Sequence, residues 1–166
     1  MVQSYPVKID PYSCAERGRR WEGELPVERF PRLRRLVLNP KAPVRFQLRF
    51  GREDHRCVAR GSVETVLRLV CQRCLEPVEV AIEQPIAVGI VTTLEEGERL
   101  PEPLEPFVVK EGEEIPLTEI LEEEILLALP PFPRHEGCRP PGEQEGFPPA
   151  SRRQHPFATL RQLKER

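Results

Sequence analysis

The stretch that decides the fold is residues 44–70, VRFQLRFGREDHRCVARGSVETVLRLV. Between residues 44 and 50 every second position is Val, Phe or Leu, with Arg or Gln between them. A turn is expected at 51–54, and the alternation resumes along 55–70. Successive side chains of a strand point to opposite faces, so this pattern predicts two long, half-buried strands that pair back on each other. The arginines between the apolar positions should then share the other face.

The elements after this hairpin are predicted from the same kind of pattern. Two further strands are expected at Val78–Ile82 and Ile86–Val91, and one edge strand inside the Glu- and Pro-rich segment 93–116. Residues Leu117–Leu129 keep the apolar spacing of a helix, with Thr118 as the expected N-cap and two prolines immediately after the helix. This helix is expected to pack on the core of the sheet.

The rest of the chain is less regular. Residues 1–43 are expected to be irregular, apart from a strand at Arg20–Leu25 and a short amphipathic piece at 30–38. Residues 130–156 are expected to form a Pro-rich loop before a short C-terminal helix at 156–164. A chain of 166 residues that is 39% hydrophobic suits one domain covering residues 1–166. The expected fold class is α+β: a mostly antiparallel sheet, barrel-like or sandwich, with one core-packed helix and a short C-terminal helix.

Charge is distributed unevenly along the chain. Residues 1–60 carry 14 Lys and Arg against 7 Asp and Glu, whereas residues 76–124 carry 15 Glu against two basic residues. A basic stretch can neutralise phosphates, and an acidic one suits a basic partner or pairing with the basic half of the same chain. No apolar run approaches the roughly 20 residues of a membrane helix, and residues 1–10 contain no signal-peptide core, so we expect a cytoplasmic protein without a membrane partner.

The cysteines suggest a metal site. Five cysteines, an odd number in a chain without a recognisable secretion signal, argue against a disulfide framework. Two close pairs, Cys71-x2-Cys74 and His135-x2-Cys138, together offer three thiolates and one imidazole, which is a complete tetrahedral set for zinc. The first pair falls on a turn between two predicted strands. A bound zinc ion would fix the Pro-rich loop to the sheet.

Two other interpretations of these residues remain open. In one, Cys71 is a small buried hydrophobic residue at a strand end and His135 is a loop residue that binds nothing. In the other, the CxxC pair is redox-active. That chemistry needs a thiolate stabilised at a helix N-terminus, whereas here the motif runs into Leu75-Glu76-Pro77 and a strand.

The sequence contains no recognisable catalytic motif. It has no GxSxG, no phosphate-binding glycine loop and no HExxH, and only three histidines. The acidic run Glu122–Glu124 is interpreted as a solvated helix face, because consecutive helical residues fan out and do not converge on one site. We therefore expect neither an enzyme nor a small-molecule substrate.

Three motifs in fixed order carry a family resemblance. They are CQRCLEP from Cys71, EILEEEILLALPPFPRH from Glu119 with Cys138 just beyond, and PFATLRQLK from Pro156. Over about its C-terminal two thirds the chain resembles the YceD family of large ribosomal RNA subunit accumulation proteins. The resemblance implies a non-enzymatic role in the accumulation of 23S ribosomal RNA. The resemblance also implies that Cys71, Cys74, His135 and Cys138 correspond to the CxxC pair and to the later His and Cys of the family. The chain departs from the family at His155, where Asn usually precedes Pro-Phe.

Two function hypotheses follow. In the first, the protein is a ribosome-assembly factor that binds 23S rRNA by phosphate contacts from one sheet face and from the CxxC turn. The arginines assigned to these contacts are Arg45, Arg49, Arg56, Arg60, Arg68 and Arg73. In the second, the acidic stretch 76–124 chaperones a basic large-subunit ribosomal protein without binding RNA.

Overall fold

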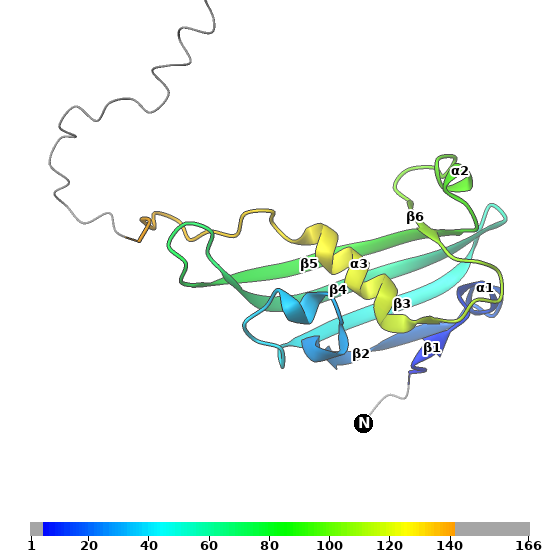
Figure 1. Ribbon diagram of the computed structural model, residues 1–166. Helices are drawn as coiled ribbons and strands as arrows, with labels where there is room; N and C mark the ends of the chain where they lie inside the picture. Colours follow the sequence, from blue (N-terminus) through cyan, green and yellow to red (C-terminus); the bar gives the residue numbers. More distant parts are fainter. Residues whose placement is uncertain (1–4, 142–166) are drawn as a thin grey trace, which may run out of the picture.

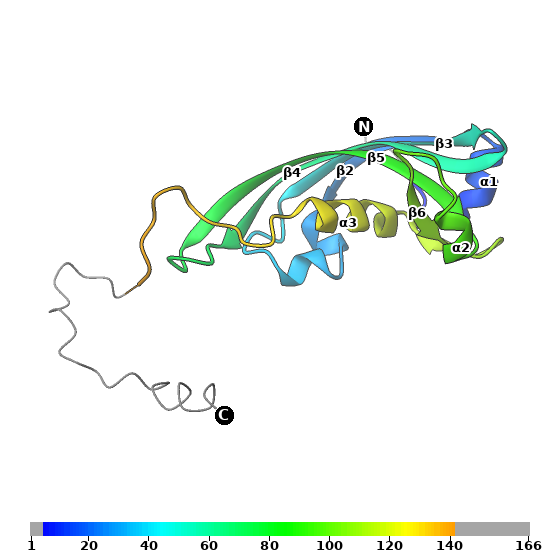
Figure 2. The same cartoon turned by 90° about the horizontal axis from the view of Figure 1, so that it is seen from above.

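The computed structural model describes residues 5–141, which form a long curved sheet with helices on its inner side (Figures 1 and 2). In chain order the elements are β1 (Lys8–Ile9), α1 (Pro11–Glu16), β2 (Arg20–Pro26), the 3-10 turns η1 (Val27–Arg29) and η2 (Leu33–Arg35), β3 (Pro43–Glu53), β4 (Arg56–Val70), β5 (Pro77–Val91), α2 (Leu94–Gly97), β6 (Glu105–Val108), β7 (Ile115–Pro116) and α3 (Leu117–Ala128). The predicted C-terminal helix at 156–164 lies outside the described residues.

The main sheet has five strands in the order β2-β3-β4-β5-β6. All neighbours pair antiparallel except β5 and β6, which are parallel, and β1 and β7 form a separate two-stranded sheet. The prediction of a mostly antiparallel α+β fold is confirmed. The barrel or sandwich is wrong for residues 5–141, because β2 and β6 do not pair with each other and α3, rather than a second sheet, covers the inner face (Figure 2).

The alternation at 44–50 creates the inner face of the sheet. Val44, Phe46, Leu48 and Phe50 are all at most 3% exposed, and on β4 the odd-numbered positions face the same core. Helix α3 closes this core with fully buried side chains, among them Ile125. Each fully buried side chain of this kind stabilises the fold by about 1.5–3 kcal/mol.

Glycine is required at one point where β3 and β4 approach closely. Gly61 lies opposite Leu48, and a Cβ atom at this position would collide with the backbone carbonyl of Gln47.

Strand β5 is continuous, whereas the sequence predicted two strands broken around Pro85. Pro85 pairs with Ser62 of β4 on one side, and on the other side β6 pairs only with Val88–Val91. On the edge of β5 away from β4, no strand lies beside Pro85, so the N–H group that proline lacks is not needed for a hydrogen bond there. This is why a proline that looks like a strand breaker sits inside a strand of 15 residues.

Helix α3 corrects two expectations. Its N-cap is Pro116, which makes no side-chain capping bond, so the prediction that Thr118 caps the helix is wrong. The solvated-face interpretation is wrong for Glu122 and Glu124, which are 4% and 5% exposed. Glu122 faces the segment before β3, and Glu124, two positions further on and so on another side of the helix, lies near Glu105 of β6.

The buried carboxylate of Glu122 ties α3 to the N-terminal segment. It accepts hydrogen bonds from the backbone N–H of Arg32 at 2.7 Å and of Leu33 at 2.9 Å, and from Arg32 Nε at 3.2 Å. The region 1–43, expected to be irregular, thus contains ordered elements besides the predicted strand, and η2 is held in place by a side chain about 90 residues away. No helix within residues 5–141 has the length and hydropathy needed to span a bilayer.

This contact generates a stability prediction. Glu122→Ala should lower the free energy of unfolding by about 2–4 kcal/mol, because it leaves two backbone N–H groups unsatisfied next to the core. The neighbouring Glu123→Ala is the matched control. Glu123 is half-exposed and pairs only with the Arg32 side chain, so its loss should cost under about 1 kcal/mol. Urea unfolding of both variants measures the difference, and equal losses would contradict the assignment.

Candidate metal centre

The first half of the candidate site is the turn that joins β4 to β5. Cys71, which is fully buried, directly follows β4, and its sulfur accepts hydrogen bonds from the backbone N–H groups of Arg73 at 3.4 Å and Cys74 at 3.5 Å. Leu75 adopts a positive φ of 65°, and its N–H donates to the Cys71 carbonyl at 3.0 Å. The turn therefore wraps its backbone around one sulfur and directs the second toward the same point.

The second half comes from the segment after α3. The carbonyl of Pro133 accepts a hydrogen bond from Gln72 N–H at 2.8 Å, which places this segment against the turn. Gly137, with a positive φ of 71°, bends the chain between His135 and Cys138. The bend brings both side chains to the same side of the loop.

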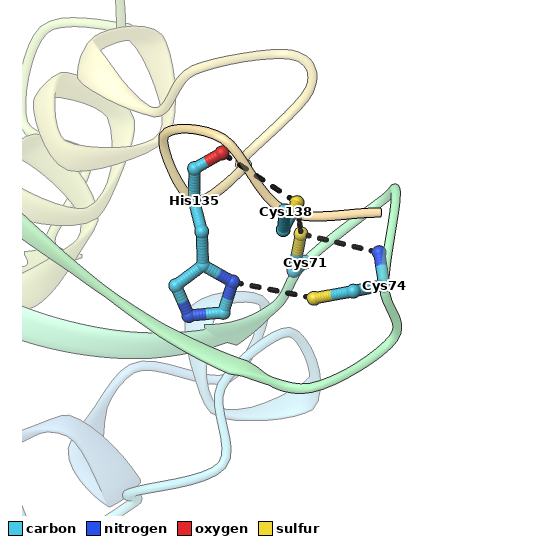
Figure 3. A group of neighbouring side chains, drawn as sticks. All are labelled: Cys71, Cys74, His135 and Cys138. Atoms are coloured by element: carbon cyan, nitrogen blue, oxygen red, sulfur yellow. Dashed lines mark hydrogen bonds between the residues drawn. The ribbon is translucent and has the colours of Figure 1, made fainter. Parts of the chain in front are cut away.

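The two halves meet with the spacing of a tetrahedral site (Figure 3). Cys71 Sγ lies 3.7 Å from Cys138 Sγ, and Cys74 Sγ lies 3.3 Å from His135 Nδ1. All four donor atoms are within 4.8 Å of one another. Zinc bonds of about 2.3 Å to sulfur and 2.0–2.1 Å to nitrogen imply donor separations of about 3.6–3.8 Å in a tetrahedron. These four residues, which the sequence singled out, can hold a metal ion with little rearrangement.

A backbone contact orients the imidazole. His135 Nε2 lies 3.0 Å from the carbonyl oxygen of Pro77, so Nε2 carries the proton and donates it. In the neutral imidazole this leaves Nδ1, which faces Cys74 Sγ, with the free electron pair that a metal ligand needs. Sequence reasoning missed this role of Pro77, because a backbone acceptor leaves no signature in residue types.

The environment of Cys71 favours a thiolate. Burial opposes its ionisation, but the backbone N–H groups of Cys74 and Arg73 donate to the sulfur and outweigh burial, so the pKa of Cys71 falls to about 5. At Cys138, burial and the adjacent sulfurs of Cys71 and Cys74 raise the thiol pKa. A cation at the centre would remove this repulsion and allow all three thiols to ionise.

The geometry favours a structural ion over redox chemistry. Four protein donors close a tetrahedral shell and leave no open position for a substrate. The CxxC pair lies on a turn between strands rather than at a helix N-terminus. The other two cysteines, Cys14 and Cys57, are buried in the main core, and burial raises the pKa of each thiol.

The structure also places the six predicted RNA-contacting arginines. Five of them lie on the outer face of the sheet, and Arg73 lies in the CxxC turn. Arg45 pairs with Glu24 at 3.0 Å, and Arg60 makes two 2.7 Å bonds to Glu53. The strands β2 to β5 place six arginines on this face (Arg20, Arg45, Arg49, Arg56, Arg60 and Arg68) and six glutamates (Glu22, Glu24, Glu53, Glu64, Glu79 and Glu83). The outer face as a whole is therefore electrically balanced.

Comparison with known proteins places this arrangement in a family. The model of the family "Large ribosomal RNA subunit accumulation protein YceD" matches residues 59–164. The chain belongs to the YceD family. It is also 30% identical, over 97% of both chains, to the large ribosomal RNA subunit accumulation protein YceD of Haemophilus influenzae. No solved structure gives a significant match.

The similarity extends further than the three sequence motifs suggested. The match to the Haemophilus YceD protein covers almost the whole chain, including the N-terminal third. The region matched by the YceD family model contains all four candidate metal ligands.

The metal centre generates a prediction for the purified protein. Protein prepared without chelator should contain one zinc per chain, measured by elemental analysis, and the Cys71→Ser/Cys74→Ser variant should contain none, because two of the four donors are lost. Cys14→Ser/Cys57→Ser is the matched control, with the same chemical change at two buried cysteines outside the site, and should keep its zinc. Metal-free wild-type protein would contradict the assignment.

Proposed function

We propose that this chain is a non-enzymatic factor, acting in the cytoplasm, that supports 23S rRNA accumulation and assembly of the large ribosomal subunit. The observation that carries the proposal is the similarity to a protein named for large ribosomal RNA subunit accumulation along 97% of both chains. The candidate metal centre supports a contact role rather than catalysis, because its four donors leave no coordination position for a reacting group.

The metal in this proposal is zinc. Three cysteine sulfurs and one imidazole nitrogen form a donor set that suits a borderline-soft ion with no geometric preference beyond the tetrahedron. Zinc would join the β4–β5 turn to the loop after α3, and so give a fixed shape to an end of the sheet that has only a small apolar cluster of its own. That cluster has three buried residues, Leu69, Cys71 and Val78.

Direct contact with 23S rRNA is the form of action that we propose. Of the arginines assigned to it, Arg49, Arg56, Arg68 and Arg73 make no side-chain hydrogen bond or ion pair with another described residue. Their guanidinium groups are therefore free for phosphates, whereas Arg45 and Arg60 already bind carboxylates.

A second candidate function is supported by the opposite end of the sheet. Residues 93–114, around α2 and β6, contain eight glutamates against Arg99 and Lys110. A surface of this composition fits a basic ribosomal protein of the large subunit. In this alternative the protein would chaperone that partner and would not bind RNA.

Cells lacking this chain should accumulate less 23S rRNA relative to 16S rRNA, and a plasmid copy should restore the ratio. The Cys71→Ser/Cys74→Ser copy should fail to restore it, because the zinc-held end is lost, whereas the Cys14→Ser/Cys57→Ser copy should succeed. Quantification of both rRNAs checks this prediction. An unchanged ratio in the deletion strain would contradict the proposed role.

A further inference from the structure

The two ends of the long β4–β5 hairpin differ in charge. The CxxC turn and the loop after α3 lie at one end, and α2 and β6 lie at the other (Figure 1). The second end carries the acidic segment 93–114. The acidic end repels a polyanion, so a surface that attracts one must be formed by basic residues elsewhere on the molecule.

A basic segment lies near the end of the sheet that carries the CxxC turn and the loop after α3, which we call the metal end. Residues 29–41 contain four arginines and one lysine and no acidic residue. Arg32 is bound by Glu122 and Glu123. Arg34 and Arg35 are exposed and have no side-chain partner among residues 5–141.

Backbone and apolar contacts hold this segment beside the metal centre. The N–H of Leu38 donates to the carbonyl of Arg68 at 2.7 Å, and Val37 packs against the small apolar cluster that contains Cys71. The segment thus runs along the part of β4 that extends beyond its pairing with β3, which ends at Thr65. Figure 2 shows the segment below α3, on the half of the sheet that ends at the CxxC turn.

Five arginines at this end are free for a ligand. They are Arg34, Arg35, Arg68, Arg73 and Arg134. All five are exposed, and none forms a side-chain hydrogen bond or ion pair with another residue of the described chain. Arg68 belongs to the outer face of the sheet, where glutamates match the arginines in number, and the other four lie outside the strands of that face.

An open groove at the same end favours a nucleic acid over a protein partner. Its volume is about 560 Å³, and its lining includes Phe132, the arginines Arg73 and Arg134, and the glutamates Glu79 and Glu136. Phe132 is 69% exposed, which is unusual for a large aromatic side chain. An exposed ring in a groove that two arginines also line can stack an unpaired base while the arginines bind neighbouring phosphates.

We infer that the metal end, defined by Arg34, Arg35, Arg68, Arg73, Arg134 and Phe132, is the surface that contacts RNA, at a single-stranded or looped segment. The inference rests on the proposed function. Five phosphate contacts should make the logarithm of the affinity fall with the logarithm of salt concentration at a slope of about 3.5–4.5. The metal centre would fix Arg73 relative to Arg134, because it joins their two segments.

The test is binding of the full-length, metal-loaded protein to a labelled fragment of 23S rRNA across a salt series. Arg34→Glu/Arg35→Glu should weaken binding about 25- to 60-fold at 0.1 M salt and lower the slope by about 1.4–1.8, as expected for two lost phosphate contacts. Arg17→Glu/Arg19→Glu is the matched control. These arginines are equally exposed, at the end of the sheet that carries α1, and their reversal should leave the slope unchanged.

A second variant separates base stacking from charge. Phe132→Ala should weaken binding about 5- to 160-fold without changing the salt slope, since stacking on an aromatic ring contributes about 1–3 kcal/mol per base. Zinc content and thermal unfolding of each variant establish that it is folded.

The outcomes separate a failure of this surface assignment from a failure of the proposed function. If wild-type protein binds RNA and both metal-end variants bind like wild type, the surface assignment is overturned and the proposed function stands. If wild-type protein binds basic large-subunit proteins and no RNA, direct RNA contact fails and this surface fails with it. Loss of affinity confined to the metal-end variants supports the inference.

Discussion

The pairing of β4 with β5 is the constraint on which the rest of the structure depends. The two strands of 15 residues remain in register from Cys57 opposite Ile90 to Val70 opposite Pro77. Because side chains alternate between faces, this register assigns every residue of both strands to the core or to solvent, and a slip of one residue would exchange Leu67 with Arg68. The same register ends the hairpin at the CxxC turn. Core and metal centre are therefore set by one ladder of backbone hydrogen bonds.

The metal centre lies in a part of the chain that few buried apolar contacts stabilise. After α3 ends at Ala128, the loop to residue 141 contains no helix or strand and contacts the turn through two backbone acceptors, the carbonyls of Pro133 and Pro77. Cys71 is fully buried, but Cys74 and Cys138 are only partly so. Since segments with few buried apolar contacts open easily, coordination by residues from both sides would supply local stability that packing does not provide.

Much of this arrangement could be predicted from sequence, and the errors share a physical cause. Alternation at 44–50 and 55–70 predicted β3 and β4, and the spacing of two ligand pairs predicted which residues converge, because both depend on local geometry. Pro85 and the buried Glu122 were misinterpreted because their roles depend on neighbours distant in sequence: an open edge beside β5 and the N–H groups of Arg32 and Leu33. The barrel was wrong for the same reason, since closure depends on which element covers the sheet.

The distribution of charge follows from these constraints. Strand alternation creates arginine positions on the outer face, but glutamates of that face neutralise some of them: Arg45 binds Glu24 and Arg60 binds Glu53. A count of arginines along the sequence therefore overestimates the attraction of that face for phosphates. Segment 29–41 differs because it carries no acidic residue and leaves Arg34 and Arg35 unpaired among the described residues. Because segment 93–114 around α2 carries eight glutamates against two basic residues, it repels a polyanion, and the unpaired arginines at the opposite end of the sheet attract one.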